Sequence, residues 1–226
     1  MAAVTRSGAR DGRSTRWDPH RKRRRAAIID AAIAAIEEFG PEALTGQIAH
    51  KAGVPRTHVY RHFQGKPALD LAVSRQVARQ IGDSVRAGLS APDGSARGLI
   101  GGAVDQHLSW VEAHPNLYRF LAQHAYTVAT TGSAAADDAK AALATELTAL
   151  LTRYMSAFDL DTAPAERVII GVVGMVDSVA AWWLEHPDVP RAQLTGELTE
   201  QVWLVIDHMA RVLGLELDPD RPLPRI

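Results

Sequence analysis

The chain has 226 residues, 46% hydrophobic and 23% charged, which is typical of a folded protein of one or two domains. It has no Cys, which excludes disulfides, Cys-based metal sites and Cys nucleophiles. The longest apolar region, Val168 to Leu184, is interrupted by Asp177 and is shorter than the roughly 20 residues of a membrane span, and no secretory signal follows the N-terminal Arg residues, so we expect a cytoplasmic protein with no membrane partner.

Basic and acidic residues are unevenly divided along the chain. Met1 to Lys66 holds 13 Lys and Arg against 6 Asp and Glu, whereas Pro67 to Ile226 holds 12 against 20. Residues 1–20 are rich in Gly, Ser, Thr and Arg without an apolar period, and we expect them to form a disordered basic arm that leads into the basic run HRKRRR (His20 to Arg25). The two parts of the chain therefore face different partners.

Three helices are expected in residues 21–66. The first runs from Arg21 to Phe39, and Gly40-Pro41 stops it. Thr45 can cap a second helix, Gly46 to Ala52, which ends at Gly53. Pro55 suits the first turn of a third helix, which runs to Phe63. The apolar stripe of the first helix consists of Ile28, Ala32, Ile36 and Phe39.

Two short helices joined at a turn with Gly, after one longer helix, form the helix-turn-helix pattern. In the third helix, Val59 and Phe63 can pack against the second. The outer face and N-terminal part of the third helix, where a recognition helix meets base edges, carry Arg56, Thr57 and Tyr60. The pattern therefore predicts a DNA-binding head.

Every segment of residues 67–226 is expected to be helical, which gives an all-α fold with about nine helices. No strand pattern and no internal repeat competes with this interpretation. The fourth to ninth helices are expected at Pro67 to Leu89, Arg97 to Ala113, Asn116 to Val128, Asp137 to Phe158, Pro164 to Glu185 and Gln193 to Leu213.

The eighth helix is apolar on nearly all sides, and such a helix must be buried all round. One chain covers only part of it, so we infer that the eighth and ninth helices pack against their copies in a second subunit as a four-helix bundle. Burial inside a large monomer is the alternative. The residues expected at the dimer interface are Gly171 and Gly174, which allow close backbone approach, with Val202, Val205, Ile206 and Met209.

The residues IAHKAGVPRTHVYRHFQGKPAL (Ile48 to Leu69) resemble the DNA-binding domain of TetR-family transcriptional repressors. The resemblance is carried by I-A-x-x-A-G-V, then V-Y-R-H-F and G-K-x-A-L at this spacing, and it covers about Arg21 to Leu69. It implies an Ω-shaped homodimer with a small three-helix head, residues 21–66, and a body, residues 67–226, that binds a ligand and dimerises.

The same resemblance implies a role for each matching residue. Arg56 and Thr57 face base edges, and Tyr60 reaches a base or its flanking phosphate. An Arg can bond both acceptors of a guanine, whereas a Lys orients the protein without selecting sequence. The DNA backbone is contacted by Thr45, His58, His62 and Lys66.

Two features flank this motif. In front of the head, Arg21, Arg23 and Arg24 can follow the DNA backbone or enter the adjacent minor groove, which would make binding strongly salt dependent. Family members usually place three residues between the capping Ser or Thr and the I-A pair, but TGQIA has only two. The second helix is therefore entered differently or begins one residue earlier, at Leu44, and the phosphate contact of Thr45 depends on which arrangement holds.

The body is expected to bind a small, largely apolar effector, lipid-like or aromatic, in a pocket among helices five to eight. Plain core packing is the alternative role for every candidate. The expected polar groups are His107, His124 and Asp177, and the expected lining is Trp110, Tyr118, Phe120, Tyr126, Met155, Met175 and Trp182.

Other function classes have less support. Metal sensing would need His107, His114 and His124 to converge without zinc-type spacing, so neither a metal nor a cofactor is expected. Sequence motifs of nucleotide-binding enzymes, serine hydrolases and zinc hydrolases are missing. A helical adaptor that binds acidic protein, or an enzyme without a recognisable motif, is the alternative to our main interpretation. That interpretation is a repressor that binds a near-palindromic double-stranded DNA operator as a homodimer and is released by its ligand.

Overall fold

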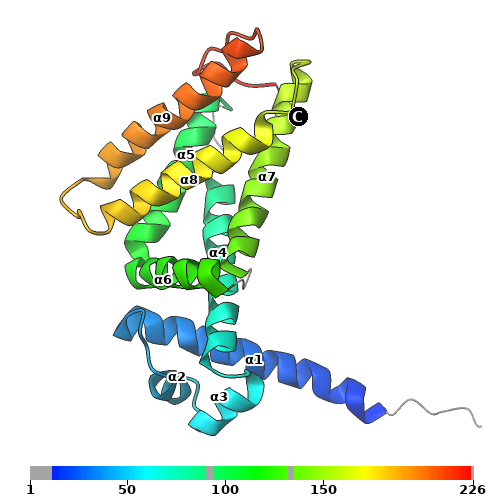
Figure 1. Ribbon diagram of the computed structural model, residues 1–226, viewed down its shortest axis with the longest axis vertical. Helices are drawn as coiled ribbons and strands as arrows, with labels where there is room; N and C mark the ends of the chain where they lie inside the picture. Colours follow the sequence, from blue (N-terminus) through cyan, green and yellow to red (C-terminus); the bar gives the residue numbers. More distant parts are fainter. Residues whose placement is uncertain (1–11, 90–93, 132–134, 225–226) are drawn as a thin grey trace, which may run out of the picture.

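Helices make up most of the described chain. The computed structural model describes residues 12–89, 94–131 and 135–224, and within these ranges the side chains of residues 12–19, 124–131 and 135–140 are outside the description. The described residues form nine α-helices and no strand, which confirms the predicted all-α fold (Figure 1). The helices are α1 (Gly12–Phe39), α2 (Thr45–Lys51), α3 (Arg56–His62), α4 (Lys66–Gly88), α5 (Ala96–Ala113), α6 (Pro115–Thr131), α7 (Ala135–Ala157), α8 (Ala165–Trp183) and α9 (Arg191–Val212).

The helix bounds agree with the prediction within three residues from α2 to α9. In contrast, α1 begins at Gly12 and not at Arg21, so residues 12–20 of the predicted disordered arm are helical. Residues 20–27 are exposed, and packing begins only at Ile28. Arg and Lys are good helix formers, so the basic run can continue the helix beyond its packed part. Figure 1 shows this part of α1 projecting from the head; residues 1–11 lie outside the described residues.

The head packs α1, α2 and α3 around one apolar core. Ile28, Ala32 and Ile36 of α1 are buried, as their spacing predicts. Phe39, predicted on the same stripe, is 46% exposed because α1 ends there, and the Lys51 ammonium lies 5.9 Å from the centroid of its ring. The residues that complete this core are Ile48, Ala49, Val59, Phe63 and Leu69.

The start of α2 matches the earlier of the two expected positions. Leu44 occupies the N-cap position, and Oε1 of Gln47 accepts a hydrogen bond from the Leu44 N–H at 2.6 Å. Thr45 is the first residue of the helix and not its cap, and it is buried. Gln47 satisfies the N–H of the cap residue, and Leu44 has no side-chain oxygen with which to cap the helix in return.

Helix α4 belongs to the head and the body at once. It starts at Lys66 beside α3 and runs through the body to Gly88 (Figure 1). Its far end meets α5 at two glycines: a Cβ on Gly88 would lie 2.1 Å from the carbonyl oxygen of Gly102, and a Cβ on Gly102 would lie 2.2 Å from that of Gly88. Only glycine fits at either position, so the two backbones are in direct contact there.

Helix α6 lies across the lower end of the body and faces the head (Figure 1). The first turn of α6 and the residue before that helix contact α1 through polar groups. Nδ1 of His114 lies 2.5 Å from Oε1 of Glu37, and the Asn116 side chain donates a hydrogen bond to the Glu37 carbonyl oxygen at 2.9 Å. The head and the body are therefore joined by these contacts as well as by α4.

Candidate DNA-binding face and body cavity

Helix α3 turns an apolar face toward the head and a polar face toward solvent. Val59 and Phe63 are buried, as predicted. A recognition helix needs this division, because its core residues hold it in place while its outer face meets base edges and phosphates. The exposed residues of the helix are Arg56, Thr57, His58, Tyr60 and Arg61.

Tyr60 links this helix to the start of α2. Its hydroxyl donates a hydrogen bond to Oγ1 of Thr45 at 3.4 Å and accepts one from Nη2 of Arg56 at 3.5 Å. The bond to Thr45, followed by that from Arg56, lowers the pKa of Tyr60. Thr45 is 6% exposed, so its predicted phosphate contact has no support from its position. Its hydroxyl instead orients Tyr60 within the head.

A basic cluster surrounds His62, where α1 passes α3. His62 is half-buried, and among the described residues its Nδ1 has no hydrogen-bond partner. Burial, followed by the positive charges around it, lowers the pKa of His62; these charges belong to Arg21, His58, Arg24 and Arg61. The structure therefore brings Arg21 and Arg24, two of the predicted DNA contacts in front of the head, together with α3. Arg23 lies exposed on the same stretch of α1.

Lys66 occupies the first turn of α4. It forms an ion pair with Asp70, with 2.5 Å between Nζ and Oδ1. An ammonium has three donors, so Lys66 can keep this partner and still meet a phosphate. The contact of Lys66 with the DNA backbone stays a prediction, and Asp70 is the group that orients the Lys66 side chain.

The body holds an apolar cavity of about 350 Å³, here called the body cavity. Its wall comes from α4 to α9 and from the residues that follow α9. Aliphatic side chains form most of the described wall, and its polar side chains are those of His107, Tyr118, Tyr154 and Asp177. A mostly apolar cavity with a few polar groups is the usual character of a small-molecule site.

Four of the predicted pocket residues line the body cavity: His107, Tyr118, Met155 and Asp177. The other aromatic candidates have different roles. Phe120 is fully buried in the core, Trp110 is buried beside the ring of His114, and Trp182 is 47% exposed and stacks on His186. Met175 is half-buried and is not part of the wall. The side chains of His124 and Tyr126 lie outside the described residues.

Tyr118 and Asp177 form the best-defined polar group of the wall. The Tyr118 hydroxyl donates to Oδ1 of Asp177 at 2.7 Å and lies 3.0 Å from the Asp177 carbonyl oxygen. Burial, followed by the negative charge of Asp177, raises the pKa of Tyr118, so its hydroxyl stays protonated. The ring of His107 lies edge-on to Tyr118, with 6.1 Å between centroids. The three side chains come from α5, α6 and α8 and meet at one place.

The segment after α9, residues 215–224, is here called the C-terminal strap, and its part in the wall was not predicted. Leu215, Leu217 and Leu223 line the body cavity. Half-buried residues at 215, 217 and 219 alternate with exposed residues at 216, 218 and 220, which is the period of an extended chain with one covered face. This alternation was the available signal, but it covers only six residues.

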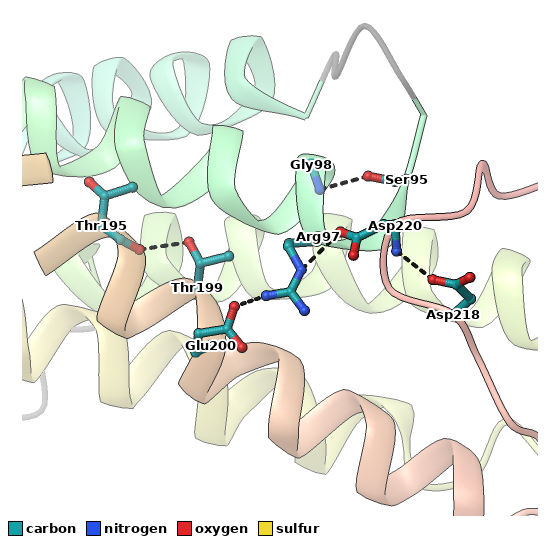
Figure 2. Close-up of polar contacts among 8 residues, drawn as sticks. All are labelled: Ser95, Arg97, Gly98, Thr195, Thr199, Glu200, Asp218 and Asp220. Atoms are coloured by element: carbon teal, nitrogen blue, oxygen red, sulfur yellow. Dashed lines mark hydrogen bonds and ion pairs between the residues drawn. The ribbon is translucent and has the colours of Figure 1, made fainter. Parts of the chain in front are cut away.

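The start of α5 holds the strap in place. The Leu223 N–H donates to the Gly94 carbonyl oxygen at 2.9 Å, and the Arg97 N–H donates to the Pro219 carbonyl oxygen at 3.0 Å. Figure 2 shows the Arg97 guanidinium between Asp220 of the strap, 3.0 Å from Nε, and Glu200 of α9. The strap is therefore tied to two helices of the body.

An apolar face on α8 and α9 points away from the rest of the chain. Gly171 and Gly174 would meet nothing within 4 Å if they carried a Cβ, and Val205 is 40% exposed, so these three predicted interface residues lie on this outer face. Val202, Ile206 and Met209, also predicted at the interface, line the body cavity instead. Their stripe on α9 faces the chain's own interior. The outer face includes two exposed residues that were not predicted there, Ile170 and Leu204.

The described residues include neither a membrane-spanning helix nor a cluster of metal ligands. No helix within these ranges is long and apolar enough to cross a membrane. The same ranges contain no group of three His, Asp or Glu that could hold a metal ion. His114, one of the histidines considered for metal binding, contacts Glu37 of the head.

Two family models match the chain. The model described as "Bacterial regulatory proteins, tetR family" matches residues 28–73, and the model described as "Tetracyclin repressor-like, C-terminal domain" matches residues 84–214. The first match includes α2, α3 and the packed part of α1, and the second includes α5 to α9. The C-terminal strap lies beyond both.

Individual proteins are also similar to the chain. An HTH-type transcriptional regulator from Mycobacterium tuberculosis is 28% identical over 216 residues, which cover 95% of this chain and 91% of that protein. A tetR-family transcriptional regulator from Streptomyces coelicolor superposes with a TM-score of 0.67 at 22% identity, over 84% of this chain and 83% of its own. FadR from Bacillus subtilis, solved in complex with stearoyl-CoA, superposes with a TM-score of 0.57 at 18% identity, over 78% of this chain and 96% of its own. These structural likenesses show a common fold.

Proposed function

Because the chain belongs to the tetR family of bacterial regulatory proteins, we propose that it is a repressor that binds a near-palindromic operator as a homodimer and leaves it when an effector fills the body cavity. The family makes the chain a DNA-binding transcription regulator with a helix-turn-helix head, and not an enzyme. The operator, the dimer, the sign of regulation and the release by a ligand belong to the proposal, as does its place in the cytoplasm, where it would meet chromosomal DNA.

The observation that carries the proposal is the exposed face of α3 beside the basic start of α1. Arg56, Thr57 and Tyr60 are exposed while Val59 and Phe63 fix the helix in the head. Arg56 can read a guanine in the major groove, and the basic cluster around His62 can meet the phosphates on either side. Thr45 is left out of this proposal because it is buried.

The outer face of α8 and α9 supports a homodimer. Exposed apolar residues such as Ile170 and Leu204 would be removed from water by a second copy. A two-fold axis along this face would place two recognition helices about one turn of DNA apart, which accounts for a near-palindromic operator.

Helix α4 supports release by a ligand. It lines the body cavity with Ile81 and Val85 and carries Lys66 in the head, so one rigid element connects the two sites. The ligand must prefer one of two positions of this helix, since equal affinity for both would shift nothing. FadR, solved with stearoyl-CoA, has the same fold, which supports the idea that such a body can take a long alkyl chain.

Selection of bound genomic fragments by the purified full chain tests the proposal. We expect an enriched inverted repeat, protection of both half-sites in footprinting, and loss of expression from a reporter that carries this repeat in its promoter. Increased reporter expression would make the protein an activator. Binding to acidic proteins without competition from duplex DNA would contradict the proposal and favour an adaptor.

A further inference from the structure

The body cavity is elongated along the helices that form it. Its wall residues on α5 extend from Ala96 to His107, eleven positions that span about 16 Å at the rise of an α-helix. On α8 they extend from Ile169 to Ala181, twelve positions that span about 18 Å. With a volume of about 350 Å³, a cavity of this length fits a slender molecule better than a compact one.

The two ends of the cavity differ in chemistry. One end, near α6, holds His107, Tyr118 and Asp177. The other end is formed by the start of α5 and by the C-terminal strap, whose leucines line it with apolar surface. Tyr154 of α7 adds one hydroxyl to the described wall. A molecule in this cavity would therefore have a polar end at Asp177 and an apolar part toward the strap.

At the polar end, the Tyr118 and Asp177 pair presents oxygen lone pairs more than hydrogens. The single hydroxyl hydrogen of Tyr118 is directed at Asp177, and burial keeps that hydroxyl protonated. Oδ1 of the Asp177 carboxylate accepts this hydrogen, and a carboxylate accepts hydrogen bonds and donates none. A ligand that meets this pair must therefore donate hydrogen bonds to it.

The charge of the wall leads to the same requirement. Asp177 is the one carboxylate in the described wall, which includes the imidazole of His107 and no Lys or Arg. A carboxylate or phosphate placed beside it would be a second negative charge next to Asp177 in an apolar cavity, which is strongly unfavourable. An ammonium would pair with Asp177, and a hydroxyl could donate to it without bringing a charge.

From these observations we propose that the effector is a slender apolar molecule with one hydrogen-bond-donating end, cationic or neutral, that is held at Asp177 while its apolar part reaches the C-terminal strap. This inference rests on the proposed ligand-responsive function and specifies the class of ligand. It excludes fatty carboxylates, which share the apolar part and differ only at the polar end.

Three probes share the same twelve-carbon chain and differ only in the polar group at its end: dodecylammonium, dodecanol and dodecanoate. Their affinities for the full-length protein, without DNA, are measured by titration calorimetry below the concentrations at which micelles form. We expect dodecylammonium and dodecanol to bind and dodecanoate to bind at least about tenfold more weakly than dodecylammonium, the effect of about one charged hydrogen bond. Equal or tighter binding of dodecanoate overturns the inference, and so does the absence of binding by all three.

Two variants test the placement of the ligand. Asp177→Asn keeps the side-chain volume and removes the charge, so the preference for dodecylammonium over dodecanoate should disappear while dodecanol still binds, which also reports an intact cavity. Leu217→Trp fills the strap end, so dodecylammonium should bind at least about tenfold more weakly while the shorter octylammonium is little affected. An unchanged preference in the first variant, or an equal loss for both chain lengths in the second, contradicts the assignment.

These measurements are independent of operator binding. If the probes follow the expected order but the protein selects no operator, the proposed function fails and the ligand class stands. If an operator is found but dodecanoate is preferred, the regulator stands and the ligand class is wrong.

Discussion

Glu37 of α1 and His114 at the end of α5 meet across the boundary between head and body, with 2.5 Å between Oε1 and Nδ1. The carbonyl oxygen of Glu37 also accepts a hydrogen bond from Asn116 at 2.9 Å. Four residues after His114, Tyr118 reaches Asp177 in the wall of the body cavity. A short polar path therefore leads from the cavity to the first helix of the head.

Glu37→Gln should weaken the transmission of ligand binding to the head. Loss of the carboxylate charge weakens the contact with His114, so the coupling between alkyl probe and operator should fall by about 0.5–2 kcal/mol. The coupling is measured as the ratio of operator Kd with and without the tightest-binding probe. Glu38→Gln is the control, because Glu38 pairs with Lys51 inside the head. Equal coupling in the two variants would remove Glu37 from this path.

Arg56→Ala should relax the sequence preference at one operator position per half-site. A bidentate Arg contact discriminates against the wrong base by about 1–3 kcal/mol. A base change at that position should therefore weaken operator binding by the parent protein by this amount, and weaken binding by the variant much less. Gel-shift titrations on single-base operator variants measure this. Arg153→Ala, at an exposed position in the body, controls for the loss of one charge. The same loss of affinity on every sequence would mean that Arg56 contacts only the backbone.

His62 should make stability pH dependent. Burial and the neighbouring cations lower its pKa in the folded state below the ordinary 6.5, so the unfolded chain binds the proton first as the pH falls. Stability is complete above pH 6.5 and should decline below it, by at most about 1.4 kcal/mol per pH unit for one proton.

Urea unfolding at several pH values checks this dependence. His62→Gln should flatten it, whereas His208→Gln, an exposed position on α9, should not. Operator DNA should reduce the decline, because phosphates favour the protonated form. A dependence that is identical in both variants would assign the proton to another group.

Gly88→Ala should destabilise the body strongly. The added methyl carbon would lie 2.1 Å from the Gly102 carbonyl oxygen, so α4 and α5 would have to separate, at a cost of about 3 kcal/mol or more. Gly196→Ala is the matched control, since its Cβ meets nothing within 4 Å on α9, and it should be neutral or stabilising by up to about 1 kcal/mol. Chemical unfolding of both variants measures the difference. Equal stabilities would show that the backbones are free to move apart.

Leu204→Asp should convert the proposed dimer to a monomer. Leu204 is 63% exposed on the outer face of α9, and a dimer would bury the new charge without a partner, at a cost of several kcal/mol. Sedimentation at micromolar concentration measures the result. Leu44→Asp introduces the same change at a residue that is 68% exposed in the head, and should leave the dimer intact. A Leu204 variant that remains dimeric would place the interface elsewhere.

The head was predictable because its signals are local. Gly53 and Pro55 mark the ends of two helices, and the spacing of Val59 and Phe63 fixes which face of α3 is buried. The start of α2 was also visible in the sequence as a shortened spacing before Ile48. The side chain that satisfies that start, Gln47, could be identified only from the structure.

The body was less predictable because an apolar stripe does not say what covers it. Val202, Ile206 and Met209 have the spacing of an interface, but they face the cavity of their own chain. Aromatic residues were equally ambiguous: Phe120 fills the core and Trp182 lies outside. Asp177 was more informative, because a charged residue within an apolar helix needs a local reason.

The contact of Gly88 with Gly102 holds the far end of α4 against α5, so a rotation of α4 would pivot at this contact. Lys66 lies 22 residues away along the same helix, about 33 Å at 1.5 Å per residue. A rotation of about 6° around the glycine contact would therefore displace Lys66 by about 3.4 Å, the distance between neighbouring base pairs. In the proposed dimer, an effector that rotated α4 by this angle would move each head by about one base-pair step along its operator.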